Sequence, residues 1–163
     1  MLAPPRDLAA DRLRTARLLA LAVPVVLLGG ALLSQYVGEL YPCEMCWWQR
    51  YPHAAAILLA GAALLSPLGA PRTRMLTLLA ALAIGVSGAI GAFHAGVEYG
   101  WWEGLTTCST GGAMSLDDIM AVPLIRCDQV QWSLFGISLA GFNAVFSLAG
   151  AAAIAFLAGR KAA

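Results

Sequence analysis

Charged side chains are scarce in this sequence: only 12% of the 163 residues are Asp, Glu, Lys or Arg. A water-soluble domain typically carries about a quarter of its residues as charged side chains. The net charge is only +1. The sequence contains no basic patch interleaved with aromatics, no phosphate-binding glycine loop and no His/Cys cluster with metal-ligand spacing. These absences exclude an ordinary soluble domain and argue against nucleic-acid binding and a metal centre.

Apolar residues, in contrast, make up 60% of the chain and fall into four long blocks. A helix needs about 20 such residues to cross a bilayer. We therefore predict an all-α, integral-membrane four-helix bundle, with residues 1–163 forming a single membrane domain. The predicted helices cover residues 18–35, 47–65, 75–97 and 132–157. No small-residue cleavage site ends a short apolar region, so the first block is interpreted as a retained helix.

The basic residues predict the orientation of these helices, because Lys and Arg are retained on the cytoplasmic side of a membrane. Most of them precede the first helix, lie between the second and third, or follow the fourth: Arg6, Arg12, Arg14, Arg17, Arg72, Arg74, Arg160 and Lys161. Only Arg50 and Arg126 remain for the opposite side. We expect both termini to be cytoplasmic and residues 36–46 and 98–131 to form two outward loops. The second loop is predicted to contain a short surface helix that begins near Ser115.

All four cysteines fall in the two outward loops, where they can be held as disulfides. They are Cys43, Cys46, Cys108 and Cys127. Four cysteines allow three pairings. The short spacing of Cys43-Glu44-Met45-Cys46 makes that pair a natural unit and leaves Cys108 with Cys127.

A Cys-x-x-Cys at the start of a helix suits redox chemistry, because the tight ring opens easily and the helix N-terminus favours a thiolate. Arg50 follows Cys46 by one helical turn on the same face. Its guanidinium can stabilise a Cys46 thiolate or donate to a carbonyl oxygen of a bound ring, but an interface anchor is an equally good interpretation. The alternatives for the cysteine pair are half of a zinc site, which needs two further ligands, and an inert disulfide.

Three stretches of the chain resemble the disulfide bond formation protein B family. The first is Pro42-Cys43-Glu44-Met45-Cys46-Trp47-Trp48-Gln49-Arg50. The second runs from Phe93-His94 through Glu98-Tyr99-Gly100-Trp101-Trp102 to Cys108, and the third is Arg126-Cys127-Asp128 with the following Trp132-Ser133-Leu134-Phe135-Gly136. The resemblance covers nearly the whole chain, and its motifs are specific in combination.

This resemblance implies a multi-pass protein of the bacterial inner membrane whose active site faces the periplasm. In that reading, a periplasmic thioredoxin-like (DsbA-like) thiol oxidase attacks Cys108, which releases Cys127 to exchange with Cys43. Cys46 then passes electrons to a membrane quinone, ubiquinone or menaquinone, held by Arg50. The family places a further polar aromatic or histidine near the quinone, and both His94 and Tyr99 are candidates here. The stretch 109–126 is shorter than in the best-known members.

Two other functions remain as alternatives to this protein-disulfide:quinone oxidoreductase. A quinone reductase like the vitamin K epoxide reductases also has four helices and a Cys-x-x-Cys. Its active pair lies near the end of a late helix, whereas here the pair opens the second. The other alternative is a non-enzymatic membrane scaffold with two structural disulfides. A bound quinone or an easily reduced Cys43–Cys46 bond would separate the enzyme from the scaffold.

Overall fold

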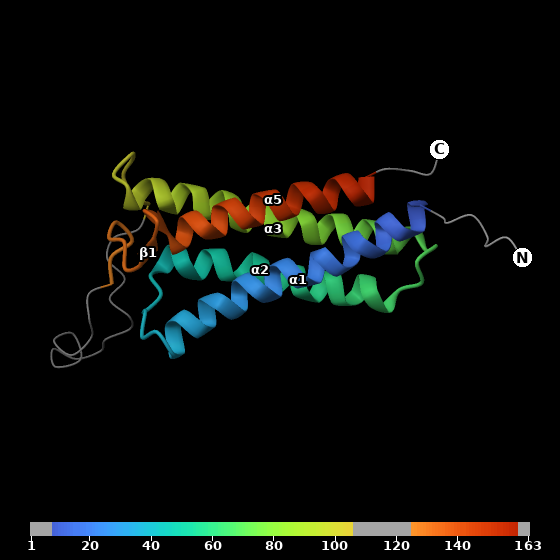
Figure 1. Ribbon diagram of the computed structural model, residues 1–163, viewed down its shortest axis with the longest axis horizontal. Helices are drawn as coiled ribbons and strands as arrows, with labels where there is room; N and C mark the ends of the chain where they lie inside the picture. The colour runs from blue at the N-terminus through green and yellow to red at the C-terminus, as the bar shows by residue number, and fades with distance from the viewer. Residues whose placement is uncertain (1–7, 106–124, 160–163) are drawn as a thin grey trace, which may run out of the picture.

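The computed structural model describes residues 8–105 and 125–159, and most of these residues are helical. Four long helices run side by side along the long axis of the molecule (Figure 1). They are α1 (Leu8–Tyr36), α2 (Glu44–Leu65), α3 (Pro71–Glu98) and α5 (Leu139–Gly159). A small antiparallel hairpin, β1 (Ser133–Leu134) and β2 (Ile137–Ser138), precedes α5. The predicted four-helix architecture is confirmed, while the surface helix expected near Ser115 falls outside the described residues.

Small side chains form the core between these helices. The largest buried cluster is made mainly of alanines, with Ile84 and Ile154 among them. Helix α3 packs along both α2 and α5, and its glycines allow the close approach to α5. A Cβ atom added at Gly88 would lie 2.9 Å from side-chain carbons of both Ser147 and Leu148. The small residues of α3 therefore lie where it contacts α5.

The outside of the bundle is apolar and its inside is partly polar. Large exposed side chains include Leu58, Leu82 and Phe156, whereas His94 and Ser87 are fully buried. Three helices, α1, α3 and α5, are long and apolar enough to cross a membrane. Helix α2 has 22 residues but carries polar side chains in its first turns, and it is not among these three. This distribution fits a multi-pass membrane protein.

The starts of two helices differ most from those predicted. Helix α1 begins ten residues earlier than expected, because the basic stretch from Arg12 to Arg17 is helical too. Helix α5 begins at Leu139 instead of residue 132, because Phe135 and Gly136 both adopt positive φ, 52° and 78°. Two consecutive residues of this kind make a tight hairpin turn. Ser133 pairs with Ser138 across it.

One end of the bundle collects basic side chains that cap helix C-termini. Arg17 of α1 is buried and donates from Nη2 to the carbonyl oxygens of Leu64 (2.6 Å) and Ser66 (3.3 Å) at the end of α2. Arg74 of α3 donates to the carbonyl of Gly159 at the end of α5. A cation near exposed C-terminal carbonyls is favourable. The start of α1 and the end of α5 lie at this end, and the hairpin lies at the other (Figure 1).

Candidate functional site

The site lies at the hairpin end of the bundle, where α2 begins. Cys43 is the N-cap residue of α2, and its Sγ accepts a hydrogen bond from the backbone N–H of Cys46 at 3.3 Å. Pro42 cannot donate a hydrogen bond and fixes the chain immediately before the cap. This local structure places the Cys43 and Cys46 sulfurs 3.0 Å apart, as free thiols.

A third cysteine, Cys127, joins this pair from the segment that precedes α5. Its side chain hydrogen-bonds that of Cys43, and both residues are buried in one apolar cluster with Met45 and Val97. Cys43 therefore contacts one thiol in its own segment and one in the segment that precedes α5. The fourth cysteine, Cys108, lies outside the described residues, so its expected pairing with Cys127 stays a prediction.

The two thiols of the Cys-x-x-Cys differ in how readily they ionise. The hydrogen bonds that Cys43 makes with Cys127 and Cys46, together with its burial, hold its pKa well above the ordinary range of a thiol. Cys46 lies in the first turn of α2, where the helix N-terminus favours a negative charge. When the reduced pair loses one proton, Cys46 therefore becomes the thiolate and Cys43 stays protonated.

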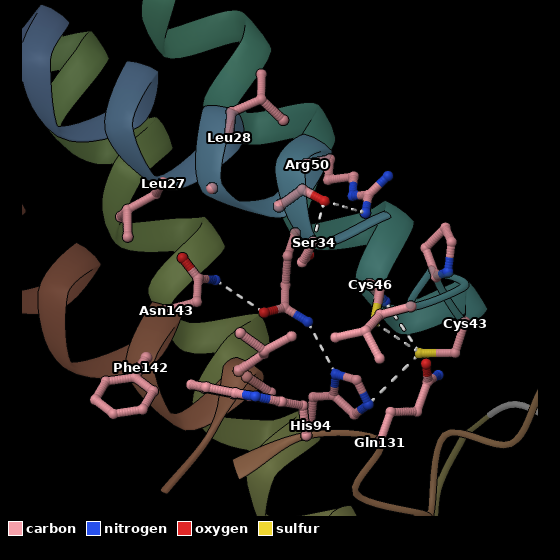
Figure 2. Close-up of a pocket in the computed structure, with 18 of the residues that line it drawn as sticks. Leu27, Leu28, Ser34, Cys43, Cys46, Arg50, His94, Gln131, Phe142 and Asn143 are labelled. Atoms are coloured by element: carbon pink, nitrogen blue, oxygen red, sulfur yellow. Dashed lines mark hydrogen bonds between the residues drawn. The ribbon is translucent and has the colours of Figure 1, made fainter. Parts of the chain in front are cut away.

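A cavity of about 250 Å³ opens beside the thiols; its apolar lining comes largely from α1 and α5, whereas α2 contributes Cys46 and polar side chains. Figure 2 shows Leu27, Leu28 and Phe142 around it, with Cys43, Cys46 and Arg50 toward one side. A cavity of about 150 Å³ is enough to hold a benzene ring. A single aromatic or quinone ring therefore fits here, against the sulfur pair.

Arg50 lies in the wall of this cavity, between α1 and α2. Its side chain is buried, and it donates from Nη1 to Oε1 of Gln35 at 2.5 Å and from Nη2 to the carbonyl oxygen of Ala31 at 3.1 Å. The guanidinium carbon also lies 4.9 Å from the ring centre of Trp47. A guanidinium has five N–H donors, so these two bonds leave donors for a ligand. The buried placement favours a binding role over an interface anchor.

His94 and Tyr99, the two other candidates, have different surroundings. His94 of α3 lines the cavity, and its Nε2 lies 3.6 Å from Cys43 Sγ and 3.8 Å from Oε1 of Glu98. The Tyr99 hydroxyl instead donates to the carbonyl of Gly136 (3.1 Å) and accepts from the backbone N–H of Ser138 (3.0 Å). Tyr99 thus holds the hairpin that precedes α5. The geometry selects His94 as the residue beside the thiols.

His94 also gives the thiol pair a possible metal-ligand set. The ligand atoms of Cys43, Cys46 and His94 all lie within 4.8 Å of one another. Thiolate and imidazole are the ligands that zinc prefers. The sequence spacing predicted no metal site, because it does not reveal that α3 brings a histidine to the Cys-x-x-Cys.

A buried chain of polar side chains leads from His94 into the bundle, and the sequence analysis did not identify it. Gln49 Nε2 lies 2.9 Å from His94 Nδ1, Asn143 Nδ2 donates to Gln49 Oε1 at 2.8 Å, and Asn143 Oδ1 lies 2.9 Å from His53 Nε2. Figure 2 shows this path from Asn143 to His94 and on to Cys43. Polar side chains within otherwise apolar helices are the signal that would have found these residues.

Comparisons with known proteins show the family to which the chain belongs. A sequence model of the family described as "Disulfide bond formation protein DsbB" matches residues 13–157. A protein of Rickettsia prowazekii (strain Madrid E), described only as uncharacterized, is 23% identical over 146 residues, which cover 85% of this chain and 83% of that protein. No solved structure matches. The family match spans all four helices, the Cys-x-x-Cys and Cys127, and the chain therefore belongs to the disulfide bond formation protein B (DsbB) family.

Proposed function

We propose that this protein reoxidises a periplasmic thioredoxin-like dithiol oxidase by disulfide exchange and passes the electrons to a membrane quinone. The cycle supports disulfide formation in exported proteins. The observation that carries the proposal is the position of Cys43, which contacts Cys46 in its own segment and Cys127 in the other. Disulfide exchange requires a thiolate to reach a sulfur directly. Cys43 is close enough to both Cys46 and Cys127 for such an exchange.

The proposed relay consists of two disulfide exchanges, each of which breaks one disulfide and forms another. The partner's thiolate attacks a Cys108–Cys127 disulfide at Cys108, and the partner's second thiol completes its own disulfide. Cys127 and Cys108, now reduced, then exchange with a Cys43–Cys46 disulfide, with Cys127 attacking Cys43. The exchange leaves Cys43 and Cys46 as thiols, the state that the structure shows. Their reoxidation to a disulfide releases two electrons and two protons.

The cavity residues fit a quinone as the acceptor. A quinone bound there would supply the acceptor for the two electrons and two protons that the dithiol releases. The apolar walls hold the ring, and Cys46 lies at the edge of the cavity. Arg50 would orient the ring by donating to a carbonyl oxygen, and His94 donates a hydrogen bond toward Cys43.

Trapping experiments test the relay. A Cys127→Ala variant is expected to hold the partner in a mixed disulfide with Cys108, whereas Cys46→Ala is expected to join Cys43 to Cys127. Non-reducing gels and mass spectrometry identify the bonds. A partner found joined to Cys43 or Cys46 in preference to Cys108 contradicts the relay.

A turnover assay separates this function from the scaffold alternative. The purified wild-type protein is expected to oxidise a reduced thioredoxin-like partner at the expense of a soluble quinone, followed by the loss of quinone absorbance. A Cys43→Ser variant is expected to be inactive. Equal, slow oxidation by both proteins would favour a scaffold with structural disulfides.

A further inference from the structure

His53 is a buried histidine that the relay does not use. It lies on α2, three residues after Arg50, so the two side chains occupy neighbouring positions on one face of the helix. Its side chain is 3% exposed and lines the same cavity as Arg50. Its Nδ1 atom is buried and has no hydrogen-bond partner among the described residues. A buried polar atom without a partner is costly, and here it borders a cavity that can supply one.

The hydrogen-bond chain determines which ring nitrogen of His53 carries the proton. Asn143 Nδ2 faces the backbone carbonyl of Ser87 at 3.2 Å, so this end of the amide is the donor. Asn143 Oδ1 is therefore the acceptor, and the ring nitrogen 2.9 Å from it, Nε2 of His53, must donate. The Ser147 hydroxyl, which donates to the same oxygen at 2.8 Å, agrees with this assignment. A neutral imidazole protonated at Nε2 has a lone pair at Nδ1.

The same reasoning applies to His94. Gln49 Nε2 donates to the backbone carbonyl of Met45 at 3.0 Å, which makes its other contact, Nδ1 of His94, an acceptor. His94 is therefore also protonated at Nε2, and this N–H faces Cys43 Sγ. The two amides thus hold both histidines in one tautomer: His94 as a donor toward the sulfur and His53 as an acceptor toward the cavity.

We propose, building on the proposed quinone site, that His53 is the residue with which this site recognises the reduced form of its ring ligand. A quinone carbonyl can only accept hydrogen bonds, whereas a hydroquinone hydroxyl can donate one. The Nδ1 lone pair of His53 accepts from that hydroxyl. Arg50, which has only donors, binds the carbonyl of the oxidised form. Each ring form thus has its own polar partner on the same face of α2.

Binding of the two ring forms tests this proposal. The full-length protein in lipid nanodiscs, with Cys43→Ser and Cys46→Ser to stop electron transfer, is titrated calorimetrically with duroquinone or durohydroquinone, and empty nanodiscs are subtracted. His53→Phe is expected to weaken durohydroquinone by about fivefold to tenfold, the net effect of one buried hydrogen bond, with little change for duroquinone. Ser147→Ala is the matched control, because it removes a network hydroxyl and keeps Nδ1; both affinities are expected to stay unchanged.

The outcomes distinguish a failure of the proposed role of His53 from a failure of the proposed quinone site. If the parent protein binds both probes and His53→Phe leaves their affinity ratio unchanged, the role of His53 is overturned while the quinone site stands. If the parent protein binds neither probe, the quinone site itself is overturned, and the role of His53 with it.

A second measurement does not depend on binding. The chain has only two histidines. Nitrogen NMR of the tag-free protein labelled at histidine is therefore expected to show two neutral rings protonated at Nε2. A ring at position 53 protonated at Nδ1 contradicts the proposal, because that nitrogen could not accept from a hydroxyl.

Discussion

At the scale of single residues, the burial of Arg50 makes its role testable. Arg50→Ala is expected to raise the apparent KM for quinone by about tenfold or more, because a hydrogen bond from a charged donor contributes about 1.5–3 kcal/mol. The Cys108–Cys127 disulfide is expected to form as before, which non-reducing mass spectrometry checks. Arg50→Lys keeps the charge but loses the planar fork, and is expected to recover only part of the affinity. An unchanged KM in the alanine variant would return Arg50 to the role of an interface anchor.

The raised pKa of Cys43 has a consequence for its reactivity. Only the thiolate is alkylated, and a raised pKa makes thiolate rare at neutral pH. In the reduced protein, iodoacetamide is therefore expected to modify Cys46 well before Cys43. The Cys43 rate should keep rising about tenfold per pH unit beyond the ordinary thiol pKa of about 8.5. Fragment-ion mass spectrometry resolves the two sites. A Cys43 rate that levels off near that pKa would show that Cys127 and Cys46 do not hold its proton.

At the scale of helices, Arg17 connects α1 to the end of α2. Arg17→Met is expected to lower the free energy of unfolding by about 1–3 kcal/mol, because two carbonyls at the end of α2 lose their donor. Arg14→Met, on the exposed side of α1, is the control and is expected to change it by less than about 0.5 kcal/mol. Thermal unfolding in detergent compares them. Equal losses would mean that Arg17 contributes only its charge.

The helices themselves could largely be predicted from the sequence, because long apolar blocks have few alternatives in a membrane. The start of α1 could not, since Arg12, Arg14 and Arg17 were treated as a flanking charge cluster. The hairpin before α5 was also missed. Its apolar residues continue the hydropathy of the helix, and only the positive φ of Phe135 and Gly136 breaks the pattern.

The candidate site was predictable where its residues are close in sequence and missed where they are distant. Cys43, Cys46 and Arg50 share one motif, so helical spacing alone places them together. Gln49 and Asn143 are 94 positions apart, and only the packing of α2 against α3 and α5 brings their amides into contact. Tyr99 looked equivalent to His94 because both lie near the outer end of the third predicted helix. The difference arises from the hairpin, which occupies the Tyr99 hydroxyl.

At the scale of the whole molecule, the basic end and the thiol end lie at opposite ends of the bundle (Figure 1). We expect all four cysteines to face the periplasm, since Lys and Arg are retained in the cytoplasm. Mild reduction of intact cells followed by a membrane-impermeant maleimide is expected to label them. Labelling that occurs only in permeabilised cells would show that the predicted orientation is wrong.

The polar face of α2 also affects how the chain is inserted during synthesis. Its Gln49 and His53 find partners mainly on α3 and α5, and α5 emerges from the ribosome after the other three described helices. A chain truncated after α3 is therefore expected to leave α2 poorly integrated, which glycosylation-site mapping in microsomes would detect; stable integration would contradict this. In the intact protein, α2 is expected to integrate stably into the membrane only after Asn143 has been synthesised. The redox site is therefore expected to form only after α5 has been synthesised.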